Sequence, residues 1–396
     1  MNDILDQVLD TARQVNASDV HFKAGLPPVF RIKGDLRSPR DIPPLSDQVI
    51  GTFALNLMND KQRAHFDKHF DIDLSYGTPN GYRYRVNVFK QRGQTGMVMR
   101  IIPPEVPDLA KLNLPDTVRK LADEQRGLVL VTGITGSGKS TTLASMIDHM
   151  NHQRSSHILT IEDPIEFLHR DRRSVINQRE IGFDAETFAT ALRAALRQDP
   201  DIVLVGEMLD LETIETALTA AETGHLVMST LHTIDAVETV NRILGMFPPN
   251  QQGQIRLSLA QSLRGIISQR LLPRADGKGM VPGVEILVMT ERIRELIEDP
   301  KRTREIREAI AEGRNMYGSM TFDQCLIDLV QRNMITYESG LEASTSPANF
   351  ALHFRGVGKS SDQVTPERLA AVEKSNAPPG EGSLELDRPQ APPKRR

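Results

Sequence analysis

A glycine-rich segment near residue 135 carries the clearest chemical pattern in the chain. It fits G-x-x-x-x-G-K-[ST] and consists of Gly133, Ile134, Thr135, Gly136, Ser137, Gly138, Lys139, Ser140 and Thr141. Glycines let successive backbone N–H groups point inward around a phosphate, where a Cβ atom would clash. A lysine here reaches the β- and γ-phosphates, and the hydroxyl after it coordinates Mg²⁺. We therefore predict that this segment binds a nucleoside triphosphate, with Ser140 on the metal.

The residues on either side of this segment supply the context that the pattern requires. Residues 127–131 form a short apolar run that predicts a buried strand, and residues 141–150 are compatible with a helix. A strand, a glycine loop and a helix N-terminus together build a phosphate cradle. This context makes an accidental match improbable.

Acidic side chains follow two further apolar runs. Residues 157–161 lead into three of them: Glu162, Asp163 and Glu166. Residues 202–205 lead into Glu207. Ligands bind at the carboxyl edge of an α/β sheet, where an acid can hold a metal ion or polarise the attacking water. We predict that Glu162 is the general base and Glu207 the acid on the metal side, although the sequence also fits the reverse assignment.

Two histidines lie at the ends of a third apolar run, 226–231. His232 follows the run, so we predict that it hydrogen-bonds the γ-phosphate. His225 precedes the run, and a structural role is open for both, more so for His225. Zinc is disfavoured because the two rings lie at opposite ends of the run with no third ligand in view.

Three arginines supply the cations that phosphoryl transfer needs. Alternation along the predicted strand 82–89 puts Arg83 and Arg85 on one face, and Arg100 lies on the next strand. In a ring these arginines could reach a neighbour's nucleotide, so we predict them as catalytic. The alternative is a solvated strand face.

Composition narrows the class of protein. The chain has 396 residues, a formal net charge of −4 and one cysteine, Cys325. The charge gives no reason to expect nucleic acid as a partner, and one cysteine cannot form a disulfide framework or a four-cysteine zinc module. The first residues lack the pattern of a secretion signal, and no run approaches the ~20 apolar residues that cross a bilayer. We expect a cytosolic protein that meets the membrane only through a partner.

The remaining pattern predicts an α/β protein of two domains. Residues 1–102 mix helices with a predicted hairpin, as in a small α+β domain, and residues 103–113 contain the prolines of a linker. Residues 114–355 alternate apolar strands with helices, which is typical of a mostly parallel sheet, and end in helices predicted at 251–269, 291–297 and 303–312. Residues 356–396 are rich in proline and predict a disordered tail.

Together these motifs resemble the secretion ATPases, specifically the type IV pilus retraction ATPases of the PilT family. The resemblance runs from Ser18 to Gln324 and includes the glycine loop, the segment 160–166, the segment 206–210 and the two histidines. It implies a PAS-like N-terminal domain, a RecA-like P-loop domain and a homohexamer with ATP between subunits. It also implies a motor on an inner-membrane pilus platform protein, with PilT paralogues as partners. In such a site Asp163, Glu166 and His225 join the nucleotide-binding residues, and Arg83, Arg85 and Arg100 face the neighbouring subunit.

Three features qualify the resemblance. The single cysteine favours the retraction branch, because extension and type II secretion ATPases commonly carry a four-cysteine module. The family's Gly-Glu-Met-Arg-Asp has Leu209 in place of the arginine, which predicts reduced turnover. The tail is longer than this branch usually carries. The alternatives are a secretion or conjugation traffic ATPase, a small-molecule kinase, and a weakly hydrolysing accessory paralogue.

Overall fold

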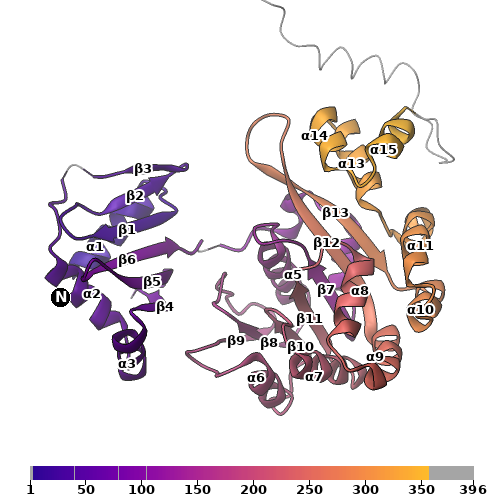
Figure 1. The fold of residues 1–396 in the computed structure, drawn as a ribbon, viewed down its shortest axis with the longest axis horizontal. Helices are drawn as coiled ribbons and strands as arrows, with labels where there is room; N and C mark the ends of the chain where they lie inside the picture. Colours follow the sequence, from indigo (N-terminus) through magenta and orange to yellow (C-terminus); the bar gives the residue numbers. More distant parts are fainter. Residues whose placement is uncertain (1–2, 40, 79, 104, 356–396) are drawn as a thin grey trace, which may run out of the picture. The chain divides into compact units, whose positions relative to one another are not determined.

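A computed structural model describes residues 3–39, 41–78, 80–103 and 105–355 of the chain (Figure 1). The predicted tail therefore lies outside the described residues. The chain divides into two compact units. The first combines the chain up to Leu271 with Val284–Met320, and the second combines Leu272–Gly283 with the chain from Thr321 onward. No helix among the described residues is long and apolar enough to cross a membrane.

An antiparallel sheet of six strands lies in the N-terminal part of the first unit. Its order is β3-β2-β1-β6-β5-β4. The strands are β1 (Asp19–Lys23), β2 (Val29–Ile32), β3 (Asp35–Arg37), β4 (Asp71–Gly77), β5 (Arg83–Gln91) and β6 (Gln94–Ile101). Helices α1 (Asp3–Gln14), α2 (Asp47–Leu57) and α3 (Asp60–His69) accompany them.

Alternation along these strands separates a buried face from a polar one. Val86 and Val88 of β5 are fully buried and share a core with Leu5 of α1 and Ile50 of α2. The residues between them point to the other face, as the period of two requires. On that face Asp19, Arg100 and Arg85 are neighbours in register on β1, β6 and β5. The sheet thus displays in one row two of the arginines that the sequence singled out.

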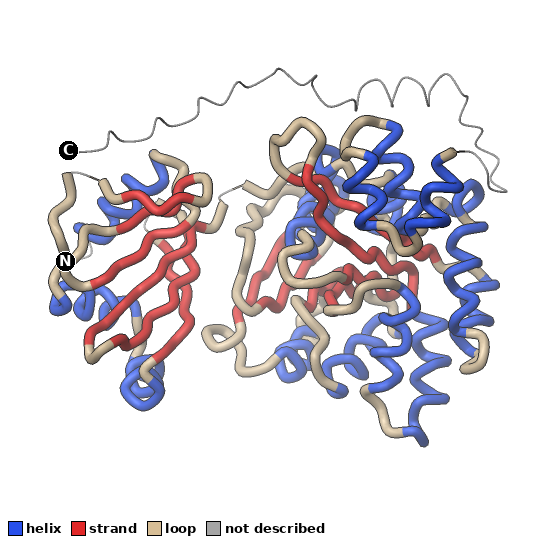
Figure 2. Tube along the Cα trace, turned by 45° about the horizontal axis from the view of Figure 1, so that its top comes forward, coloured by secondary structure: helices blue, strands red, loops and turns tan. Residues whose placement is uncertain are grey.

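A seven-stranded sheet forms the centre of the rest of the first unit. Its order is β13-β12-β7-β11-β10-β8-β9. The strands are β7 (Gly127–Thr132), β8 (His157–Glu162), β9 (Val175–Glu180), β10 (Ile202–Val205), β11 (Leu226–Leu231), β12 (Leu263–Pro273) and β13 (Met280–Val288). Every neighbouring pair from β12 to β9 is parallel. This confirms the predicted α/β class with a mostly parallel sheet. Figure 2 shows the strands in red and the helices in blue.

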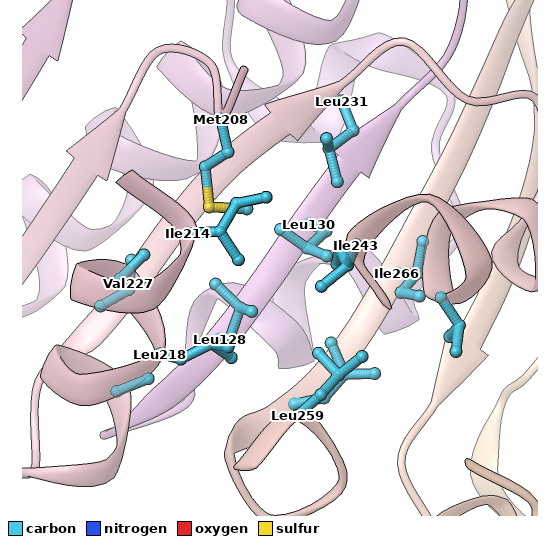
Figure 3. Close-up of a cluster of buried hydrophobic side chains, with 14 of the residues drawn as sticks. Leu128, Leu130, Met208, Ile214, Leu218, Val227, Leu231, Ile243, Leu259 and Ile266 are labelled. Carbon is cyan, nitrogen blue, oxygen red and sulfur yellow. The ribbon is translucent and has the colours of Figure 1, made fainter. Parts of the chain in front are cut away.

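Helices pack on both faces of this sheet. On one face Leu128 and Leu130 of β7 meet Ile214 and Leu218 of α7, together with side chains of α8 and α9 (Figure 3). Val129 and Val131 alternate to the opposite face, where α5 contacts β7. The helices are α4 (Asp116–Ala122), α5 (Lys139–Gln153), α6 (Phe188–Ala195), α7 (Leu211–Glu222), α8 (Ala236–Gly245), α9 (Pro249–Ser262), α10 (Glu291–Glu298), α11 (Ile306–Glu312) and α12 (Arg314–Tyr317).

The second unit contains the turn between β12 and β13 and a small group of helices. These are α13 (Phe322–Gln331), α14 (Tyr337–Ala343) and α15 (Pro347–Phe354). Phe350 of α15 is fully buried and stacks near Phe354 and Tyr337. These aromatic contacts join α14 to α15.

One predicted helix is partly wrong. Residues 251–269 were predicted as a continuous helix, but α9 ends at Ser262 and strand β12 begins at Leu263. Ile266 and Ile267 are both fully buried, because β12 lies inside the sheet with helices on either face. An apolar run that is buried on both faces shows no alternation, so its pattern does not distinguish a strand from a helix.

Candidate active site

The phosphate loop has the backbone geometry that its glycines predict. It connects the end of β7 to the start of α5, and Gly133, Gly136 and Gly138 have φ of 144°, 79° and 91°. Residues with a Cβ atom rarely adopt such angles. Lys139 is buried, and its Nζ donates to the carbonyls of Gly133 at 2.8 Å and Ile134 at 3.0 Å. The ammonium group is thus held inside the loop.

Ser140 and Thr141, the next two residues, lie in the first turn of α5, which begins at Lys139. Ser140 is exposed beside the loop and Thr141 is half-buried, so both hydroxyls are near the helix N-terminus. Ile134 and Thr135 are exposed at the loop tip, whereas the Ser137 side chain is buried. A helix N-terminus with free N–H groups favours an anion.

Strand β12 packs directly against this loop. The sequence did not predict this strand. A Cβ atom on Gly133 would lie 2.4 Å from the carbonyl oxygen of Gln269. A Cβ atom on Gly138 would lie 2.7 Å from the side-chain Nε2 of Gln269. Gln269 is itself 3% exposed, and its Oε1 accepts a hydrogen bond from Thr142 of α5 at 2.9 Å. Periodicity in this run gives no strand signal, but its composition does: the β-branched pair Ile266 and Ile267 favours a strand, and Pro273 marks its end.

Two of the predicted catalytic residues meet at the carboxyl edge of the sheet. Glu207 follows β10 and His232 follows β11, and their carboxylate and ring Nε2 lie 3.4 Å apart. Burial lowers the pKa of Lys139, while the charge of Glu207 raises it, so the carboxylate is close to the ammonium group. The structure therefore brings Lys139, Glu207 and His232 into one cluster.

Asp163 belongs to the same charged surroundings. Desolvation raises the pKa of its carboxyl group, Glu207 raises it further, and Arg85 lowers it. A carboxyl group between a second acid and an arginine is sensitive to any new charge placed nearby. Glu166 is exposed three residues further along.

Glu162 lies at the end of β8, and two hydrogen bonds hold one of its two carboxylate oxygens. Its Oε1 accepts from the Thr160 hydroxyl at 2.6 Å and from Gln178 Nε2 at 3.1 Å. Among the described residues, its Oε2 accepts from the backbone N–H of Glu166 alone, at 3.5 Å. Burial raises the pKa of this carboxyl group, and the hydrogen bonds oppose that shift. One oxygen is thus fixed, while the other keeps accepting capacity.

His225 does not join this cluster. It precedes β11, whose first residue pairs with Gly127 at the start of β7, so it lies at the amino edge of the sheet. Its Nδ1 is 3.0 Å from the carbonyl oxygen of Ala220. The phosphate loop follows the opposite end of β7, so His225 cannot contact a nucleotide held by the loop of the same chain.

The three arginines have different surroundings. Arg83 pairs with Glu180 of β9 at 2.5 Å, and the same carboxylate accepts a short hydrogen bond from Ser75. Arg100 is exposed and pairs with Asp19 at 2.9 Å. Arg85 is half-buried and close enough to Asp163 to lower its pKa. Of these three arginines, Arg85 is the one whose charge acts on Asp163.

The oxygen donors at the site suit a hard cation. No group of three or more histidine, cysteine or acidic side chains among the described residues could hold a metal ion by itself. Mg²⁺ commonly binds through one or two protein oxygens together with phosphate and water. The exposed Ser140 hydroxyl and the half-buried Glu207 carboxylate fit that requirement.

Comparison with known proteins identifies the family. The model of the type II/IV secretion system protein family matches residues 1–349. The chain is 45% identical over 348 residues to the Pseudomonas aeruginosa protein "Type IV pilus retractation ATPase PilT", covering 88% of this chain and 100% of that protein. It is 36% identical over 359 residues to the type IV pilus ATPase PilU of the same organism, covering 90% and 92%.

A solved structure agrees with these relatives. The crystal structure of the pilus retraction motor PilT with bound ADP has a TM-score of 0.80 and 46% identity, covering 87% of this chain and 97% of that chain. The predicted resemblance is confirmed. The chain is an ATPase and belongs to the PilT family of type II/IV secretion ATPases.

Proposed function

We propose that this ATPase drives the retraction of a type IV pilus. The observation that carries the proposal is the cluster of Lys139, Glu207 and His232 at the sheet edge. It occurs in a chain that aligns with the whole length of a relative named as a pilus retraction ATPase. A cluster of this kind beside a phosphate loop is suited to cleaving the γ-phosphate bond.

We assign a role to each residue of the site, including Glu162 at the end of β8, from the groups that surround it. Lys139 neutralises the phosphates, and the backbone N–H groups of Gly133–Thr141 cradle them. Glu162 orients and deprotonates the attacking water through Oε2, because Oε1 is already occupied by Thr160 and Gln178. His232 stabilises the γ-phosphate from the end of β11.

Ser140 and Glu207 would hold Mg²⁺, which supplies positive charge on the phosphate oxygens when it is bound. The charge of Glu207 also opposes the lowering of the Lys139 pKa that burial causes. Of the three arginines on the N-terminal sheet, Arg85 is the one proposed to act on the phosphates, because Arg83 is paired with Glu180 and Arg100 with Asp19.

The setting of the motor is the remaining part of the proposal. We infer a homohexamer that works at the cytoplasmic side of the inner membrane, where it engages a platform protein of the pilus machinery and its own paralogues. The chain itself then needs no span, and none is found among the described helices.

Leu209 favours a second candidate, an accessory ATPase with slow turnover. The leucine is 54% exposed and lies two residues after Glu207, at the position where the resemblance implies an arginine. An apolar side chain there supplies neither charge nor hydrogen-bond donors. A turnover number far below that of the 45% identical relative would support this candidate.

The experiment is complementation in a piliated bacterium that lacks its own retraction ATPase. Wild type should restore twitching, and Lys139→Ala should not, because the phosphates lose their main cation. Lys61→Ala, an exposed lysine on α3, is the matched control and should behave as wild type. Active ATP hydrolysis in vitro without any restored twitching would contradict the pilus assignment but leave the ATPase assignment intact.

A further inference from the structure

Two buried polar side chains connect the phosphate loop to strand β12. Thr142 is 1% exposed and Gln269 is 3% exposed, and the hydroxyl of the first donates to Oε1 of the second at 2.9 Å. They are separated by 127 positions in the chain. A buried hydrogen bond between such distant residues fixes two elements against each other and leaves a costly unpaired group if either partner is lost.

Gln269 lies directly against the phosphate loop. Its backbone carbonyl faces Gly133 so closely that no Cβ atom would fit, and its Nε2 faces Gly138 so closely that a Cβ atom there would displace the side chain. Its neighbour Ser268 accepts a hydrogen bond from Thr132, the last residue of β7, at 2.9 Å. Ser268 and Gln269 of β12 therefore contact both ends of the phosphate loop. Gln269 also contacts the first turn of α5, which follows the loop.

We propose that Gln269 is a positioning residue for ATP hydrolysis, acting through Thr142 and the two loop glycines. It does not contact the nucleotide. It sets the position of the loop N–H groups and Lys139, which depend on where Gly133 and Gly138 lie. Displacement of catalytic groups by about 1 Å is enough to lower a rate roughly a hundredfold.

The same strand leads out of the first unit. β12 runs from Leu263 to Pro273, and its residues from Leu272 onward belong to the second unit. Gln269 thus lies three residues before that boundary, on a continuous strand.

The test uses the purified full-length chain and measures ATP hydrolysis against ATP concentration. Thr142→Val keeps the shape and removes the donor, Thr142→Ser keeps the hydroxyl, and Gln269→Leu removes the acceptor. We expect Thr142→Val and Gln269→Leu to raise KM or lower kcat. In each variant kcat/KM should fall roughly tenfold, which is the effect of losing one buried hydrogen bond. Thr142→Ser should retain wild-type values.

Two further proteins separate positioning from general stability. Ser229→Ala removes a buried hydroxyl that donates to Val205 in the same sheet, so it should lower Tm but leave KM and kcat unchanged. The double variant of Thr142→Val and Gln269→Leu should be no worse than the poorer single variant.

The proposal is overturned if Thr142→Val hydrolyses ATP as wild type does, if the two substitutions combine multiplicatively, or if Ser229→Ala reproduces the change in kcat/KM. Because the readout is hydrolysis by the isolated protein, the result is independent of whether the motor acts on a pilus.

Discussion

At the scale of single residues, Glu285 is a carboxyl group buried against a helix N-terminus. It lies on β13, and its Oε1 accepts a hydrogen bond from the backbone N–H of Ala236, the first residue of α8, at 3.0 Å. Burial raises its pKa from 4.5 to about 7, and Asp235 contributes in the same direction. The hydrogen bond from Ala236 and the charges of Arg307 and Arg270 oppose the shift.

This pKa predicts how stability depends on pH. Between pH 4.5 and about 7 the unfolded chain releases the proton of Glu285 while the folded chain retains it, so wild type loses stability as pH rises. Glu285→Gln removes this dependence and keeps the acceptor. The free energy of unfolding of Glu285→Gln minus that of wild type should be about 2–3 kcal/mol more positive at pH 8 than at pH 5. Urea unfolding at the two pH values measures this difference. Glu215→Gln, an exposed acid on α7, is the control and should show no such trend.

Leu209 permits a second prediction at this scale. It lies between Glu207 and Asp210, the N-cap of α7, whose carboxylate accepts from Thr213. Leu209→Arg should raise kcat roughly tenfold, since a charge-assisted hydrogen bond near the reacting phosphate is worth about 1.4 kcal/mol. Leu209→Gln tests polarity without charge and should give less. Equal ATPase rates for the leucine and arginine proteins would remove any role for this position in turnover.

At the scale of elements, the sequence predicts best what is encoded locally. The phosphate loop was predictable because β7, the glycines and the start of α5 are consecutive in the chain. Strand β9 (Val175–Glu180) was not predicted, because it lies at the edge of the sheet and four of its six residues are polar, so it lacks the apolar run of a central strand. Gln269 was missed for a different reason: its contact with Thr142 depends on the strand order, which places β12 beside β7. No periodicity near residue 269 contains that information.

Strand β12 also permits a test of its packing. A Cβ atom on Gly265 would lie 2.7 Å from both methyl groups of Leu121 and 2.9 Å from the carbonyl oxygen of Leu287. Gly265→Ala should therefore destabilise the protein by about 1–3 kcal/mol, because the backbone carbonyl cannot move aside. Gly253→Ala on α9 makes the same chemical change where nothing lies within 4 Å, and it should stabilise by about 0.5–1 kcal/mol. Thermal unfolding that lowers Tm for both would contradict the packing argument.

At the scale of the whole molecule, the question is which subunit supplies Arg85. Within one chain its charge reaches Asp163, whereas Arg83 and Arg100 are paired with Glu180 and Asp19. We predict that in the assembled ring Arg85 acts on the nucleotide of a neighbour, so that hydrolysis requires assembly. Specific ATPase activity should then fall on dilution together with the hexameric mass.

Mixing two inactive proteins shows whether Arg85 acts on the nucleotide of its own chain or on that of a neighbouring subunit. Lys139→Ala lacks a working phosphate loop but has Arg85, and Arg85→Ala has the loop but lacks the arginine. If Arg85 acts across an interface, about a quarter of the sites in rings formed from an equal mixture combine an intact loop with an intact arginine, so activity returns. If it acts within its own chain, every site lacks one group and the mixture stays inactive. Arg37→Ala, an exposed arginine on the same sheet paired with Asp35, should be fully active alone. Recovery in the mixture, with none in either protein separately, would therefore identify the ring itself as the catalytic unit.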